Sequence, residues 1–128
     1  MTAPVPAQYA RPLGLAVAGG RALLGAVAMV APDVVARPWV GAEGSGPQRR
    51  VLARALAGRD LALGIGALIA DRRGAGFRGW VEGGVLADCG DVVATLVAFP
   101  HLPKWGRFVV LAAAGGAAAA GGLAAPNL

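Results

Sequence analysis

Residues 51–70, VLARALAGRDLALGIGALIA, and residues 80–99, WVEGGVLADCGDVVATLVAF, decide how the chain folds. Each segment has about the 20 residues that a helix needs to cross a hydrocarbon core of roughly 30 Å. Neither alternates apolar and polar residues as a strand would. We therefore predict two membrane-spanning helices, both with charged side chains in their interiors.

Two more apolar segments flank this central pair. Residues 12–32 contain one charged residue, Arg21, and residues 108–125 contain none. A soluble helix keeps a polar face, which both of these segments lack. The pattern predicts an all-α fold, a polytopic membrane protein built as a four-transmembrane-helix bundle, with spans at about residues 12–32, 51–70, 80–99 and 107–125.

The remaining segments set the limits of the domain. We expect a flexible N-terminal tail at residues 1–11, a single four-helix membrane domain at residues 12–125 and a C-terminal tail at residues 126–128. Residues 33–50 are rich in Pro, Gly, Ser and charges, which predicts an exposed loop. The charge at Arg21 argues against a cleaved signal peptide over the first apolar run.

The composition also indicates lipid as the solvent. Of the 128 residues, 56% are hydrophobic and 15% charged, and the mean hydropathy is +0.60. The net charge of +5 comes from basic residues placed singly or in pairs, so we expect no nucleic-acid partner. One cysteine excludes an internal disulfide, and no motif predicts a cofactor or a metal. The wealth of Ala, Gly, Val and Arg is typical of a GC-rich bacterial genome, which predicts a multi-pass protein of a bacterial cell membrane.

Five charged residues fall near the centres of the predicted spans. An ionised side chain at the centre of a helix costs about 2.5–3.5 kcal/mol on insertion, so we expect these residues to pair with one another inside the bundle. Two arginines face three carboxylates, which leaves one excess negative charge unless Arg54 reaches the cluster. The five residues are Arg21, Arg59, Asp60, Asp88 and Asp91.

Three functions are compatible with this cluster. The first is structural, with Arg–Asp pairs that hold the helices in one register. The second is a membrane-embedded enzyme that uses Asp88 and Asp91 as a proton-transfer pair on a lipophilic small molecule, with Arg59, Asp60 and Arg21 as charge partners. The third is a small proton-coupled transporter or channel that acts as an oligomer. Because Asp88 and Asp91 share a helix face, we expect one of them to hold a proton near neutral pH.

Small residues in the second span predict close helix packing. Gly58, Ala62, Gly66 and Ala70 recur every four residues, which places them on one face. Such faces also fit a homo-oligomer or a larger membrane complex. The basic residues at the two ends of the spans are nearly balanced, so the orientation in the membrane stays open, with a slight preference for cytoplasmic termini.

Two stretches carry a family resemblance: AGRDLALGIGAL at residues 57–68 and LADCGDVVATL at residues 86–96. They resemble a family of small bacterial and fungal four-helix membrane proteins, a domain of unknown function, in which an RDxxxG helix precedes a helix with an interior aspartate. The resemblance implies a membrane location and a four-helix topology, without any particular activity. The residues that match the motifs are Arg59, Asp60, Gly64, Asp88 and Asp91.

Overall fold

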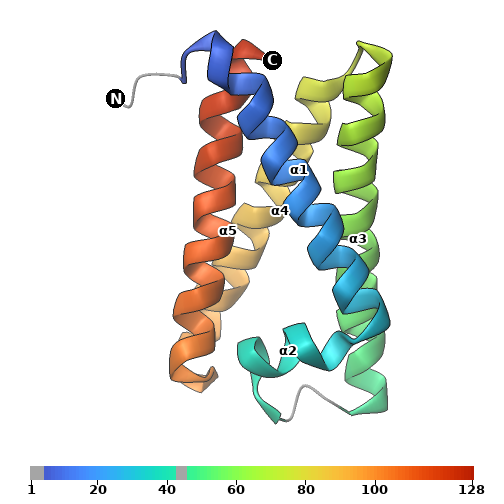
Figure 1. The fold of residues 1–128 in the computed structure, drawn as a ribbon. Helices are drawn as coiled ribbons and strands as arrows, with labels where there is room; N and C mark the ends of the chain where they lie inside the picture. The colour runs from blue at the N-terminus through green and yellow to red at the C-terminus, as the bar shows by residue number, and fades with distance from the viewer. Residues whose placement is uncertain (1–4, 43–45) are drawn as a thin grey trace.

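The computed structural model describes residues 5–42 and 46–128, and within these ranges the chain forms five α-helices and no strand (Figure 1). The prediction of an all-α fold is confirmed for this part of the chain. Two single-turn 3₁₀ helices, Phe99–His101 and Ala125–Asn127, follow α4 and α5. The helices are α1 (Ala7–Val30), α2 (Pro32–Val40), α3 (Pro47–Arg73), α4 (Phe77–Val97) and α5 (Lys104–Ala124).

The first helix begins earlier than the sequence predicted. α1 starts at Ala7, so residues 7–11 of the expected flexible tail are helical, and Ala10 is fully buried. The tail packs because the amide of Val5 donates to the carbonyl of Leu123 (3.3 Å), and the side chain of Asn127 donates to the carbonyl of Val5 (2.8 Å). Both ends of the described chain therefore lie together, and the rest of the predicted tail, residues 1–4, lies outside the described residues.

The expected exposed loop at residues 33–50 is wrong at both ends, because residues 33–40 belong to the short helix α2 and residues 47–50 to the first turn of α3. Pro32 occupies the first turn, where its missing amide costs no hydrogen bond, and Asp33 favours the positive end of the helix dipole. The helix ends at Val40, and Gly41 is its C-cap, with an amide that donates to the carbonyl oxygen of Arg37. Turn-forming composition concealed a helix of nine residues because its stability comes from tertiary packing.

The four long helices run up and down in chain order (Figure 1). Both termini and the turn between α3 and α4 lie at one end of the bundle, and α2 and the α4–α5 connection lie at the other. The tight α3–α4 turn uses Gly74 and Gly76, whose φ angles of 70° and 81° are strained for residues with a side chain.

Two glycines allow close backbone contact between α1 and α3. A Cβ built on Gly64 would lie 2.6 Å from the amide nitrogen of Ala22, and one on Gly25 would lie 2.7 Å from that of Leu61. Gly66, a member of the predicted packing row, instead faces the Trp80 ring. Small residues do bring α3 against a neighbour, but the contact uses a different face from the one that the spacing suggested.

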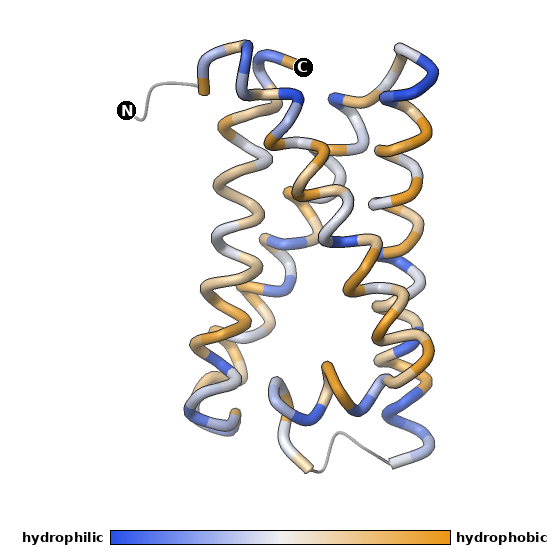
Figure 2. Tube along the Cα trace, in the orientation of Figure 1, coloured by the Kyte–Doolittle hydropathy of each residue, from blue (hydrophilic) through white to orange (hydrophobic). Residues whose placement is uncertain are grey.

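The distribution of apolar side chains is inverted relative to a soluble protein. The buried apolar residues are alanines apart from Val81, whereas large residues face outward, with Leu86 75% and Val97 79% exposed. Two helices, Ala7–Val30 and Lys104–Asn127, are long and apolar enough to cross a membrane, which supports a membrane location. The sequence predicted four such helices, and α3 and α4 do not meet this criterion, since both carry interior charges. Figure 2 shows these charges as hydrophilic segments midway along the bundle.

Candidate functional site

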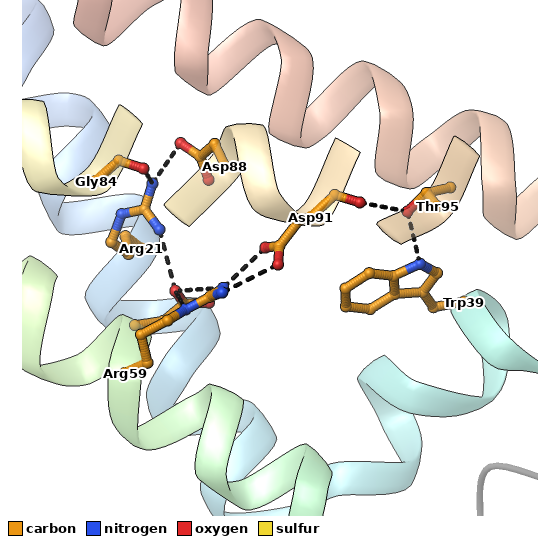
Figure 3. A network of polar contacts seen from close by, with 8 residues as sticks. Arg21, Trp39, Arg59, Gly84, Asp88, Asp91 and Thr95 are labelled. Carbon is orange, nitrogen blue, oxygen red and sulfur yellow. Dashed lines mark hydrogen bonds and ion pairs between the residues drawn. The ribbon is translucent and has the colours of Figure 1, made fainter. Parts of the chain in front are cut away.

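The five charged residues predicted to meet do lie together, about halfway along the bundle. α1 contributes Arg21, α3 contributes Arg59 and Asp60, and α4 contributes Asp88 and Asp91 (Figure 3). We call these five residues the midplane cluster. Its contacts therefore connect three helices that are distant in the sequence.

Arg21 is the most enclosed cation of the cluster, with a side chain that is 7% exposed. Its Nη1 donates to Oδ1 of Asp60 at 3.0 Å, and its Nη2 donates to Oδ2 of Asp88 and to the carbonyl oxygen of Gly84 at 3.2 Å. A Cβ on Gly84 would lie 3.3 Å from Nε and Nη2 of this arginine. The absence of a side chain at position 84 thus lets the guanidinium lie against the backbone of α4.

Arg59 completes the cluster on its more open side, with a side chain that is 30% exposed. It makes a bidentate pair with Asp91, in which Nη1 donates to Oδ1 at 3.0 Å and Nη2 donates to Oδ2 at 2.8 Å. Its Nε and Nη2 also donate to Oδ1 of Asp60, which accepts from Arg21 as well. Asp60 is therefore the link between the two Arg–Asp pairs.

The cluster holds two positive charges and three carboxylates when all are ionised. Arg54, the cation that could have balanced them, instead donates to the carbonyl oxygen of Met29 at 3.1 Å and is exposed. Asp88 and Asp91, predicted to act as a pair, bind different arginines. One excess negative charge remains, which one bound proton would neutralise.

Two further residues extend the polar network to α2. The hydroxyl of Thr95, which is 1% exposed, donates to the carbonyl oxygen of Asp91 at 2.7 Å and accepts from Nε1 of Trp39 at 3.0 Å (Figure 3). The sequence analysis missed both residues. The i, i+4 spacing of Asp91 and Thr95 was a signal for the threonine, but nothing in the sequence indicated that the indole of Trp39 points into the bundle.

Two ion pairs at opposite ends of the bundle were also missed. Nε and Nη2 of Arg11 bind both carboxylate oxygens of Asp71, at 2.7 and 2.8 Å, and Arg50 makes a similar pair with Asp33. The hydrogen bonds from these arginines hold the pKa of each partner carboxyl below its usual range. Each pair joins segments that are distant in the sequence, so residue spacing could not reveal it.

The contacts of the midplane cluster favour a structural role over a catalytic one. All three carboxylates of the cluster accept hydrogen bonds from arginine, Asp91 through both oxygens and Asp60 and Asp88 through one oxygen each. One open surface groove is lined by residues such as Ile65 and Trp80 and another by residues such as Asp33 and Arg54, and no residue of the cluster lines either of them.

Comparisons of the chain with protein-family models, with curated proteins and with solved structures found no match. The resemblance of the RDxxxG and interior-aspartate helices to a four-helix membrane family therefore stays a prediction.

Proposed function

We propose that this chain is a multi-pass membrane protein in which all four long helices cross the bilayer, and in which the midplane cluster locks α1, α3 and α4 in a single arrangement. The observation that carries the proposal is the inverted distribution of side chains. Arg21 and Asp88, with side chains 7% and 8% exposed, lie inside, while Leu and Val side chains face outward. Lipid accepts an apolar exterior that water would disfavour.

The same inversion explains how α3 and α4 can cross a membrane despite their charges. A charge that faces lipid opposes insertion, whereas one that pairs within the bundle avoids most of that cost. In α3, Arg59 and Asp60 pair within the cluster, and in α4 Asp88 and Asp91 do. The outward faces of α3 and α4 carry apolar residues such as Ile65 and Leu86. Arg54 of α3 is also exposed, and its Nε donates to the carbonyl oxygen of Met29.

A structural role accounts for the contacts better than an enzyme or a transporter. General acid–base catalysis needs a carboxyl group within hydrogen-bond reach of a substrate atom, but Asp88 and Asp91 are both engaged by arginines. Interior ion pairs of this kind specify one arrangement of helices even where they add little net stability. The bilayer is the partner that this role requires.

Cysteine labelling tests the four-span topology. In a Cys89→Ser background, we would introduce single cysteines at Gln8, Gln48, Ala75 and His101 and label intact cells or right-side-out vesicles with an impermeant maleimide. The proposal expects Gln8 and Ala75 on one side and Gln48 and His101 on the other, because the ends of the bundle alternate. Labelling of Gln48 and Ala75 from the same side would mean that α3 does not cross, and would refute the proposal.

Stability measurements test the lock. We would compare the wild type with Arg59→Leu, Asp60→Asn and Asp91→Asn in detergent, following thermal unfolding by circular dichroism. A structural lock expects each variant to lose stability, and Arg59→Leu to lose most, since that arginine binds two carboxylates. Variants as stable as the wild type would instead indicate that these residues are kept for a chemical function.

A further inference from the structure

An open apolar groove runs along the outer face of α3 beside the start of α4. Its volume is about 490 Å³. Ile65, Ile69 and Trp80 are 46%, 43% and 41% exposed, so these walls are accessible from outside the bundle. The groove is lined by Leu61, Ala62, Ile65, Gly66, Ile69, Ala70, Arg73, Ala75 and Trp80.

A glycine shapes the floor of the groove. The Trp80 ring lies against Gly66 so closely that a Cβ at position 66 would overlap the ring. The flat indole therefore forms one wall and the α3 side chains form the other. The shape of the groove therefore depends on the contact between Trp80 and Gly66.

The groove has the length of one membrane leaflet. Leu61 directly follows Asp60 of the midplane cluster, and Arg73 is the last residue of α3. The twelve residue steps between Leu61 and Arg73 correspond to about 18 Å of helix. Half of a hydrocarbon core is roughly 15 Å, so a chain lying in the groove would extend from the bilayer centre to the headgroup level.

The headgroup end of the groove is positively charged. Arg11 and Arg78 at this end are paired with Asp71 and Glu82. Arg72 and Arg73 are exposed, and neither has a hydrogen-bond or ion-pair partner among the described residues. Arg73 lines the end of the groove, and Arg72 precedes it in the last turn of α3.

We propose that this groove binds an anionic phospholipid, with an acyl chain along Leu61, Ile65 and Ile69 and the phosphate at Arg73 and Arg72. The apolar length selects a lipid chain, and the positive charges of the two arginines select a negative headgroup over a zwitterionic one. This inference rests on the proposed function, because the groove meets lipid only if α3 crosses the bilayer.

Quenching of tryptophan fluorescence by brominated lipids tests the site. We would reconstitute the protein into phosphatidylcholine nanodiscs and add dibrominated phosphatidylglycerol or dibrominated phosphatidylcholine in increasing mole fractions. The Trp80 signal is the difference between the wild type and Trp80→Phe. We expect half-maximal quenching of Trp80 at an about fivefold lower fraction of the anionic lipid, the effect of one basic side chain near an anionic surface, and a larger preference if both arginines act.

Matched variants assign the preference to the groove. Arg73→Gln should reduce it by about fivefold, the contribution of one cation, whereas Arg49→Gln, an exposed arginine at the opposite end, should leave it unchanged. Ala62→Phe, which fills the groove from α3, should reduce quenching by both lipids.

The measurements distinguish failure of the lipid site from failure of the four-span topology. Equal quenching by the two lipids, in a protein whose cysteine labelling shows four spans, would overturn the lipid site and leave the proposed function intact. Failure of α3 to cross the bilayer would overturn both. Loss of the preference in inorganic phosphate, but not in sodium chloride of equal ionic strength, would assign the arginines to a soluble phosphate and also overturn the proposal.

Discussion

Removing Arg21 should be the most damaging single change in the midplane cluster. Its guanidinium binds Asp60, Asp88 and the carbonyl oxygen of Gly84. In Arg21→Met, Asp60 keeps its contact with Arg59, but Asp88 loses the single ion-pair partner that it has among the described residues. Its side chain is 8% exposed. Breaking a buried pair on one side costs about 3–5 kcal/mol, because the remaining charge is left uncompensated.

Replacing both partners should restore much of that loss. In Arg21→Met/Asp88→Leu no uncompensated charge remains at this position, and substitution of a buried ion pair by apolar residues is often neutral or stabilising. We therefore expect the double variant to be at least about 2 kcal/mol more stable than Arg21→Met, a coupling within the range measured for residues in direct contact. Without Arg21, the protein should therefore be less stable with Asp88 than with leucine at that position.

Equilibrium unfolding in mixed detergent micelles, with sodium dodecyl sulfate as the denaturant and circular dichroism as the signal, measures both variants. Arg54→Met is the control, since Arg54 is exposed and lies outside the midplane cluster, with a hydrogen bond to the carbonyl oxygen of Met29, and a surface substitution changes stability by about 0.5 kcal/mol or less. The reasoning is refuted if Arg21→Met costs no more than Arg54→Met, or if the double variant is as unstable as Arg21→Met.

Three further predictions concern other parts of the fold. Gly64→Leu should destabilise the protein by about 1–3 kcal/mol in the same unfolding assay, because a side chain there meets the backbone of α1. Lowering the pH should destabilise the wild type below about pH 4, the usual pKa of an aspartate, since the carboxyl of Asp71 has a lowered pKa while it accepts hydrogen bonds from Arg11. The stability from this pair is present above the ordinary pKa and lost as the pH falls through the lowered one. In Asp71→Asn, the unfolding temperature should therefore depend less on pH in this range. Trp39→Phe should cost about 0.5–1.5 kcal/mol through loss of the hydrogen bond to Thr95.

The glycine and tryptophan predictions each have a control variant. Gly19→Ala should be neutral or slightly stabilising, because a Cβ at Gly19 meets nothing within 4 Å and alanine favours a helix. Trp105→Phe should have little effect on unfolding, since Trp105 is 85% exposed. Equal losses in the glycine variants, equal losses in the tryptophan variants, or an unchanged pH profile in Asp71→Asn would contradict the respective explanation.

Local patterns in the sequence were sufficient to predict the four long helices and the height of the charged residues along them. Apolar runs of about 20 residues place four long helices, and the position of a residue within its run sets its height in the bundle. Arg21, Arg59, Asp60, Asp88 and Asp91 were therefore found from the sequence as one level of the structure, and their contacts do join three helices.

Only the tertiary structure decided which arginine of the midplane cluster binds which aspartate. Height in a helix leaves its rotation about the axis undetermined, so the sequence could not show that Asp88 binds Arg21 while Asp91 binds Arg59. That rotation is set by close backbone contacts such as that of Gly64 with α1. The helix α2 and the contact of its Trp39 with Thr95 also depend on packing between distant segments, because a short helix has too few internal hydrogen bonds to form on its own.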